Sequence, residues 1–116
     1  MHELAITQAI LDTVLKHAAT ARATRVTRVL LVVSELSDLH PAWLQRYFTE
    51  LAAGTVAAPA HLEIEREAPE FTCNSCNRSF ALSLAGVEFV ECPDCNSRDC
   101  TLRLGADYVV EQIEVE

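Results

Sequence analysis

Basic residues are scarce in this sequence. Lysine and arginine together number 9 against 17 aspartates and glutamates, which gives a formal net charge of −8 at pH 7. Proteins that bind a nucleic-acid backbone need a basic face, so this balance argues against DNA or RNA as a partner. It suits a cation, or a partner protein that carries basic patches.

Long apolar runs, low-complexity tracts and internal repeats are also missing. No segment approaches the ~18 consecutive apolar residues of a membrane-spanning helix, so membrane insertion is not expected. The sequence opens without the charged and then apolar segment of a secretory signal, and we therefore expect a cytoplasmic protein. With 116 residues, 50% of them hydrophobic, the chain has enough apolar side chains for one compact domain with a small lobe.

Four of the five cysteines form two Cys-x-x-Cys pairs. Cys73 and Cys76 are followed, after fifteen residues, by Cys92 and Cys95. This spacing matches four-cysteine zinc sites, in which each short pair turns tightly enough to direct both sulfurs at one ion. Because four ligands leave no open position on the metal, the pattern predicts a structural zinc site and not a catalytic one.

The residues around the two pairs support this interpretation. Asn77 and Asn96 directly follow the pairs, where the turn often needs a positive φ that asparagine tolerates better than other non-glycine residues. Phe71, Phe80 and Phe89 flank the loops, and we expect them to pack the lobe. A lobe this small cannot bury enough apolar surface alone, so the metal is expected to stabilise it.

Other uses of the cysteines stay open at this point. Iron suits a tetrahedron of four thiolates as well as zinc does. Two disulfides are possible in an oxidising compartment, but no signal segment indicates export. A redox dithiol is disfavoured because two pairs that share one metal leave no free reactive pair. Cys100 lies outside both pairs and is expected to be a free or partly buried thiol.

Hydrophobic periodicity predicts two helices and three strands outside the lobe. The helices are expected from Leu4 to about Ala21 and from Pro41 to Gly54, and the strands over Thr24–Leu36, His61–Glu67 and Tyr108–Glu116. The predicted fold is α+β: a small three-stranded sheet with two helices, plus an inserted zinc-ribbon-like lobe with four cysteine ligands. The predicted domains are 1–68 with 106–116 and, inserted between them, 69–105.

The pattern also suggests how the three strands are arranged. The strand of Thr24–Leu36 has a continuous apolar run, which predicts burial on both faces and a central place in the sheet. The last strand returns after the lobe, and we expect it to pair with the strand of His61–Glu67, which precedes the lobe.

The first three residues offer a second set of metal donors. The α-amine of Met1, the amide nitrogen and imidazole of His2, and the carboxylate of Glu3 can surround one ion with fused chelate rings. Nitrogen and oxygen donors in a plane favour Ni(II) or Cu(II) over the tetrahedral preference of Zn(II). A histidine at this position is most often solvated, so the residues alone indicate binding only weakly.

These features together resemble the HypA/HybF family. The resemblance is carried by Met1-His2-Glu3-Leu4, by Ser34-Glu35-Leu36-Ser37 before Pro41, by the two Cys-x-x-Cys pairs and by the ending Ile113-Glu114-Val115-Glu116. It covers essentially the whole chain. The family comprises nickel metallochaperones for the maturation of [NiFe]-hydrogenase, and some members also serve urease.

The resemblance implies specific sites and partners. Nickel is expected at Met1, His2 and Glu3 as transferable Ni(II), and structural Zn(II) at the four paired cysteines. The implied partners are a nickel-handling maturation GTPase of the HypB type and the hydrogenase large subunit. A monomer or a homodimer is expected, without enzymatic activity.

Departures from the family pattern remove no ligand. Ala5, Ser34 and Asn96 stand where Ser, Gly and Gly are common, and residues 69–105 contain no histidine that could reach nickel from the lobe. The alternatives are a zinc-ribbon module that binds protein or nucleic acid without handling nickel, and an enzyme. Neither a basic ribbon nor a catalytic constellation is visible.

Overall fold

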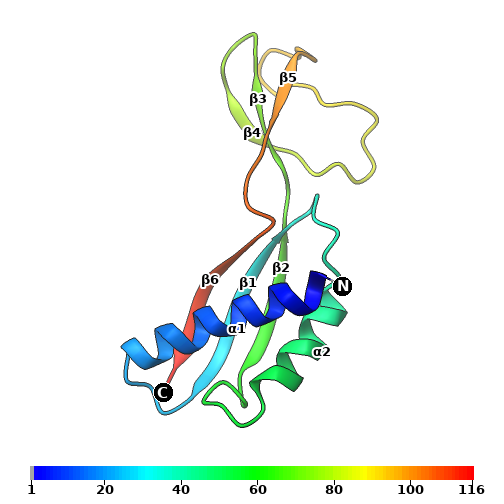
Figure 1. Ribbon diagram of the computed structural model, residues 1–116. Helices are drawn as coiled ribbons and strands as arrows, with labels where there is room; N and C mark the ends of the chain where they lie inside the picture. Colours follow the sequence, from blue (N-terminus) through cyan, green and yellow to red (C-terminus); the bar gives the residue numbers. More distant parts are fainter. Residues whose placement is uncertain (1) are drawn as a thin grey trace. The chain divides into compact units, whose positions relative to one another are not determined.

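The computed structural model describes residues 2–116, which contain two helices and six strands (Figure 1). The elements are α1 (His2–Thr20), β1 (Val26–Ser34), α2 (Pro41–Ala52), β2 (His61–Glu67), β3 (Glu70–Cys73), β4 (Ser79–Ala81), β5 (Cys100–Arg103) and β6 (Tyr108–Val115). The predicted α+β class is confirmed. No helix among residues 2–116 combines the length and the apolar character needed to cross a membrane.

The chain divides into two units. The first unit consists of residues 1–33, 38–65 and 108–116, and contains both helices and the sheet of β2, β1 and β6. The second unit consists of residues 66–107 with the short segment Ser34–Ser37, and contains the sheet of β4, β3 and β5.

Helix α1 forms where apolar residues recur with helical spacing. Ile10, Val14 and Ala18 lie on its buried side, each with a relative exposure of 1% or less, and Leu11 lies beside them. The segment is rich in alanine and leucine, which have high helix propensity. The helix begins two residues earlier than predicted, so His2 and Glu3 are helical residues.

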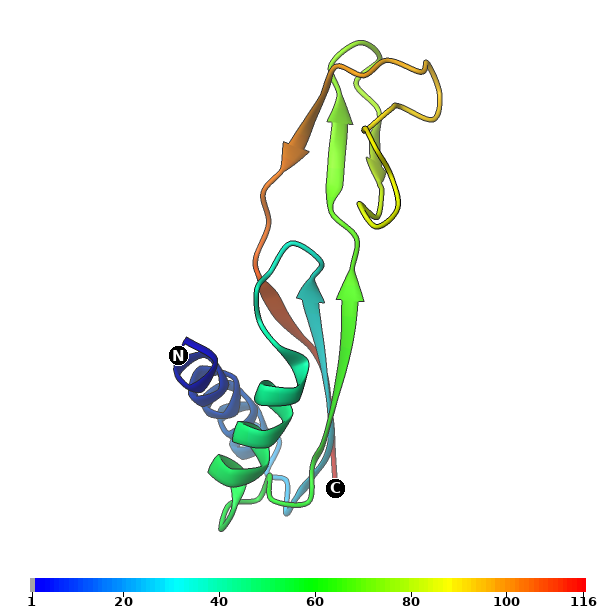
Figure 2. The same ribbon diagram turned by 90° about the vertical axis from the view of Figure 1, so that its right-hand side faces the viewer.

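Strand β1 is the central strand of the first unit, as predicted, but only one of its faces is fully buried. Val29, Leu31 and Val33 have no exposed surface and belong to the main core. On the other face, Leu30 is 9% exposed, and Arg28 and Val32 are partly exposed. Both helices cover the same face of the sheet, as Figure 2 shows, and this explains the one-sided burial.

The expected pairing of the last strand is wrong. Strand β6 pairs antiparallel with β1, with Val29 opposite Ile113 and Val33 opposite Tyr108, and the sheet order is β2-β1-β6. Strands β1 and β2 run in the same direction (Figure 2), joined through α2 as a β-α-β crossover. The central place of β1 follows from its apolar run, whereas the partner of β6 depends on tertiary packing.

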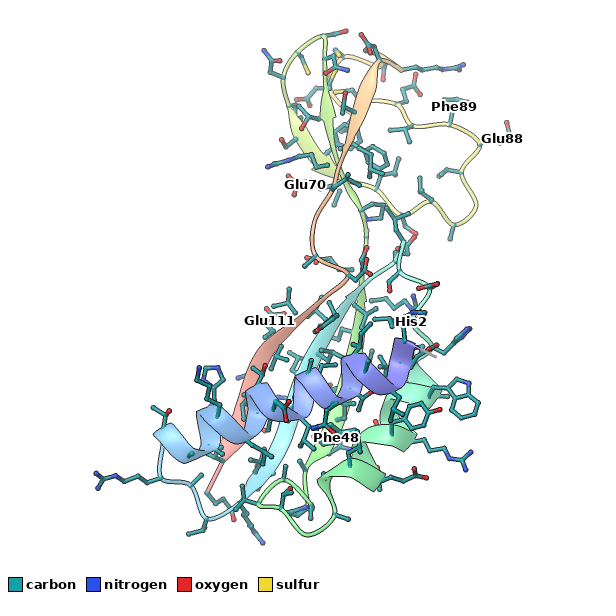
Figure 3. All side chains as sticks on the ribbon, in the orientation of Figure 1. His2, Phe48, Glu70, Glu88, Phe89 and Glu111 are labelled. Atoms are coloured by element: carbon teal, nitrogen blue, oxygen red, sulfur yellow. The ribbon has the colours of Figure 1, made fainter. Side chains whose placement is uncertain are left out.

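Helix α2 starts at Pro41, the position that proline prefers. Leu44, Phe48 and Ala52 are buried against the core, and the Phe48 side chain is labelled in Figure 3. Trp43 is 44% exposed and stacks on Tyr47 with ring centroids 5.6 Å apart. The aromatic pair therefore lies at the margin of the helix interface, not in the core.

The second unit contains a three-stranded sheet that the sequence patterns did not predict. Strand β3 pairs antiparallel with both β4 and β5. Phe71 and Phe80 face each other across β3 and β4, are stacked at 5.9 Å and are nearly buried. Phe89, however, is 45% exposed and does not belong to this core, so the expected packing holds for two of the three phenylalanines.

Candidate metal sites

The four paired cysteines come together in the second unit. The sulfurs of Cys73, Cys76, Cys92 and Cys95 all lie within 4.8 Å of one another. The sulfurs of Cys73 and Cys95 are 3.5 Å apart and those of Cys76 and Cys92 are 3.6 Å apart. Four sulfurs placed ~2.3 Å from a central ion form a tetrahedron with edges of ~3.8 Å. The cluster therefore has the size of a tetrahedral four-thiolate metal site.

Each cysteine pair forms a tight turn of the predicted kind. Asn77 has a φ of 63° and Asn96 a φ of 62°, the left-handed region that asparagine tolerates. The Asn77 N–H donates to the carbonyl oxygen of Cys73 at 2.8 Å, and the Asn96 N–H donates to that of Cys92 at 2.9 Å. The two turns thus repeat one backbone geometry, which directs the sulfurs of each pair to the same side.

Side chains next to the cysteines connect the two turns. Arg78, from the first turn, forms an ion pair with Asp94 of the second. The Ser75 hydroxyl donates to the Ser97 hydroxyl at 2.9 Å. These contacts hold the cysteine pairs opposite each other, so the protein itself contributes to the arrangement of the four sulfurs.

The acid–base chemistry of the cluster favours a bound cation. The backbone N–H of Cys76 lowers the pKa of the Cys73 thiol to about 6, so this sulfur ionises easily. The backbone N–H of Arg78 also lowers the pKa of Cys76, but the neighbouring Cys92 sulfur and burial outweigh it and raise that pKa to about 12. Like charges this close oppose one another. A cation at the centre removes this opposition and allows all four thiolates to form.

All five cysteines are free, and no pair is within the ~2.05 Å of a disulfide bond. Cys100 is partly buried, as expected, and its sulfur lies 3.6 Å from the Ser97 carbonyl oxygen. Burial raises the pKa of the Cys100 thiol, and its sulfur is not one of the four that cluster.

Two of the three residues predicted to hold nickel, His2 and Glu3, lie at the start of α1, in the first unit. His2 Nδ1 is 3.7 Å from a carboxylate oxygen of Glu3, and His2 Nε2 is 3.1 Å from Oδ1 of Asp38. The His2 side chain is 51% exposed, and Figure 3 labels it at the start of α1. Met1, the third predicted residue, lies outside the described residues.

Asp38 is a candidate site residue that sequence reasoning missed. It lies 36 positions from His2 and precedes α2 by only three residues. No spacing rule joins two segments so far apart. The position of Asp38 just after the Ser34-Glu35-Leu36-Ser37 motif, which helped to carry the family resemblance, is the one signal in the sequence that pointed to this segment.

The helix geometry leaves the amide groups near His2 available. The first N–H groups of an α-helix have no partner within the helix, and α1 begins at His2. The carbonyl oxygen of Glu3 accepts a hydrogen bond at 2.6 Å from the buried Thr7 hydroxyl, which fixes the first turn. A metal could therefore use amide nitrogens here without breaking a hydrogen bond of the helix.

Comparison with known proteins places this arrangement in a family. The family model described as "Hydrogenase/urease nickel incorporation, metallochaperone, hypA" matches residues 1–115. The hydrogenase maturation factor HypA of Chlorobium limicola is 34% identical over 116 residues, which cover the whole chain and 97% of that protein. The HypA factor of Dehalococcoides mccartyi is 32% identical over 116 residues, covering the whole chain and 95% of that protein.

Solved structures agree on the fold. The solution structure of the Ni metallochaperone HypA from Helicobacter pylori has a TM-score of 0.68 and 20% identity, and the similarity covers 97% of this chain and 96% of that one. Another solution structure of a HypA protein has a TM-score of 0.74 and 21% identity, with 100% and 97% coverage. At these identities the similarity supports the fold alone.

The fold, the cysteine cluster and the family model together define a metallochaperone for nickel incorporation during hydrogenase maturation. The chain belongs to the HypA family, because the family model covers nearly all of it and relatives above 30% identity align with it from end to end.

Proposed function

We propose that this protein binds Ni(II) at its amino terminus and delivers it during the maturation of [NiFe]-hydrogenase. The ligands in this proposal are the α-amine of Met1, the amide nitrogen and imidazole of His2, and the carboxylate of Glu3. The zinc-ribbon alternative explains the four cysteines but gives no role to the donors that surround His2.

The contact between His2 and Asp38 is the observation that best supports this proposal. When the Asp38 carboxylate accepts a hydrogen bond from Nε2, the proton of the neutral ring is on Nε2 and the lone pair is on Nδ1. Nδ1 is the ring nitrogen that can close a six-membered chelate with the amide nitrogen of the same residue. A carboxylate on the far side of a ligating imidazole also fixes the ring and strengthens its basicity.

The local charge supports binding that is reversible. The start of a helix carries a partial positive charge equivalent to about +0.5, which opposes a cation. The carboxylates of Glu3 and Asp38 offset it, because both lie within 4 Å of the His2 ring. The site has few ligands and the His2 side chain is 51% exposed, which limits the affinity and favours release.

The second metal in this proposal is structural Zn(II), held by Cys73, Cys76, Cys92 and Cys95. The tetrahedral size of the cluster and its need for a central cation support it. Four thiolates occupy the whole coordination shell, so this ion stabilises the fold and is not passed on. The proposed domains are 69–105 for the inserted zinc-binding part and 1–68 with 106–116 for the nickel-binding part.

The proposed partners follow from the family. Nickel is received or passed on together with a nickel-handling GTPase of the HypB type, and it is delivered to the hydrogenase large subunit in the cytoplasm. Urease is a second proposed target, because the family description includes it. The net charge of −8 is compatible with cationic cargo.

Nickel titration of the zinc-loaded protein and of His2→Ala tests the proposal. We expect His2→Ala to bind Ni(II) at least about tenfold more weakly, equivalent to ~1.4 kcal/mol, while its zinc content stays the same. His17→Ala is the matched control, because His17 is an exposed histidine on the same helix. Equal nickel affinity in the wild type and His2→Ala would rule out the terminal site.

A further inference from the structure

The second unit exposes more large apolar side chains than its small core explains. Six of the eleven exposed large hydrophobic residues of the described chain belong to it, although it is the smaller unit. Three of them, Leu84, Val87 and Phe89, follow one another closely on the long connection between β4 and β5. They are 38%, 40% and 45% exposed, respectively. Clustered exposure of this kind indicates an interaction surface.

Two of these side chains, Val87 and Phe89, line a groove. The groove has a volume of about 320 Å³ and is lined by Leu82, Val87, Glu88, Phe89 and Glu91. Figure 3 shows Glu88 and Phe89 on this connection. The lining therefore combines three apolar side chains with two exposed carboxylates, which we call the rim of the groove. Neither metal site uses any of these five residues.

The connection has a defined shape. The Glu35 carboxylate accepts hydrogen bonds from the Ser83 hydroxyl at 2.7 Å and from the Leu84 N–H at 3.1 Å. Gly86 has a φ of +78°, and the Val87 N–H donates to the Leu84 carbonyl oxygen, so residues 84–87 form a tight turn. A surface that is ordered before binding loses less entropy when a partner docks.

The Phe89 ring is held in place from one side. The guanidinium carbon of Arg98 lies 3.6 Å from the ring centroid, a cation–π contact. Arg98 thus fixes the ring without burying it. An aromatic ring that is exposed and fixed is a typical anchor of a protein–protein interface.

The charges around the groove select its partner. Among the described residues, Glu88 and Glu91 form no ion pair. The other arginines of the connection and its neighbours are already engaged: Arg78 with Asp94 and Arg103 with Glu70. Arg98, which lies over the Phe89 ring, offsets only one of the two carboxylates, so the groove keeps a net negative charge, which favours lysine or arginine on the partner.

We propose that the groove formed by Leu82, Val87, Glu88, Phe89 and Glu91 is a docking surface for a partner protein. The segment that docks has a large apolar side chain flanked by lysine or arginine. The net charge of −8 on each copy makes two copies repel one another, which argues against a second copy of this chain as the occupant. The inference does not depend on nickel binding, since the groove contains no residue of the terminal site.

Titration with three matched synthetic peptides tests the proposal, with the zinc-loaded, ¹⁵N-labelled full chain as the receptor. In the first peptide, leucine and phenylalanine alternate with lysine. The second has glutamate in place of each lysine, and the third has serine in place of each apolar residue. We expect the first peptide to shift the amide signals of residues 82–91, and the other two to bind at least about tenfold more weakly.

Charge reversal in the protein separates this groove from general attraction to an acidic surface. We expect Glu88→Lys combined with Glu91→Lys to weaken the first peptide at least about tenfold. The control combines Glu65→Lys with Glu111→Lys, two exposed carboxylates on strands of the first unit. It should change the affinity less than about twofold. Phe89→Ser should also weaken binding, because it removes the apolar anchor.

Three results would overturn the proposal. The first is equal binding of the acidic or the serine peptide. The second is a shift pattern centred outside residues 82–91. The third is an equal loss of affinity in the Glu65 and Glu111 control. Zinc content and amide dispersion of each variant establish that the second unit remains folded, so a loss of binding in Glu88→Lys with Glu91→Lys reports on the groove.

Discussion

The two units of this protein bury very different amounts of apolar surface. The core of the first unit contains fourteen buried hydrophobic residues, drawn from both helices and the sheet. The core of the second contains four, and two of these, Cys73 and Cys92, are members of the cysteine cluster. The first unit therefore has a hydrophobic core of its own, whereas we expect the second to depend on a metal bound by its cysteines.

The two candidate metal sites also differ, in how firmly the surrounding structure holds their ligands. The four cysteines are brought together by two backbone turns and by contacts between them, and we propose that the metal they hold is structural. The donors around His2 lie at the exposed start of a helix whose stability comes from packing further along. Loss of metal should therefore unfold one unit and leave the other intact.

Removal of the cluster metal is expected to have the largest effect. Structural zinc contributes about 10–16 kcal/mol to the folding of small metal-binding modules. We expect Cys73→Ser combined with Cys92→Ser to abolish zinc binding and to collapse the amide signals of residues 66–107. The signals of α1, β1 and α2 should remain dispersed. A second unit that stays folded without metal would contradict this comparison.

Truncation of a side chain in the main core should instead destabilise the first unit. Phe48 is 1% exposed in the core of the first unit, so Phe48→Ala should destabilise that unit by about 3–5 kcal/mol. Denaturant unfolding, followed at the amides of α1 and β1, measures this change. Phe89→Ala is the matched control in the second unit, and its cost should stay below about 1 kcal/mol because the ring is exposed. Similar losses in the two variants would show that the units do not differ as described.

Asp38→Asn tests the support of the terminal site. The substitution removes the carboxylate that holds His2 Nε2, and groups in this position typically contribute a factor of about 10–100 to metal affinity. We expect nickel binding to weaken within that range and zinc content to stay constant. Asp12→Asn, an exposed carboxylate of α1, is the control. Unchanged nickel affinity in Asp38→Asn would mean that the carboxylate has no part in the site.

The smallest effect is expected at the turns after the cysteine pairs. Asn77 and Asn96 have positive φ, which costs other L-residues about 1–2 kcal/mol and costs glycine almost nothing. Asn77→Ala should therefore release zinc to a chelator more readily than the wild type, while Asn77→Gly should match it. The same order is expected at Asn96. If alanine and glycine behave alike at both positions, the left-handed turns do not contribute to metal retention.

Local patterns in the sequence predicted much of this structure. The spacing of Ile10, Val14 and Ala18 determines the buried side of α1, and Pro41 marks the start of α2. The spacing of the four cysteines predicted that their sulfurs would meet, and the asparagines after them predicted the positive φ. In each case the signal lies within a few residues of the structure it specifies.

Features that depend on distant segments could not be predicted in this way. The pairing of β6 with β1 joins residues about eighty positions apart, and the alternation of either strand fits more than one partner. Asp38 reaches His2 only because α1 and α2 pack together. The short strands of the second unit have three or four residues each, too few to show a period.

X-ray absorption at the nickel and zinc edges of one doubly loaded sample tests the division of the two metals most directly. The account predicts that nickel has only nitrogen and oxygen neighbours, and that zinc has four sulfurs at about 2.3 Å. A shell of sulfur around nickel would contradict it, because nickel would then reside in the cysteine cluster and not at His2.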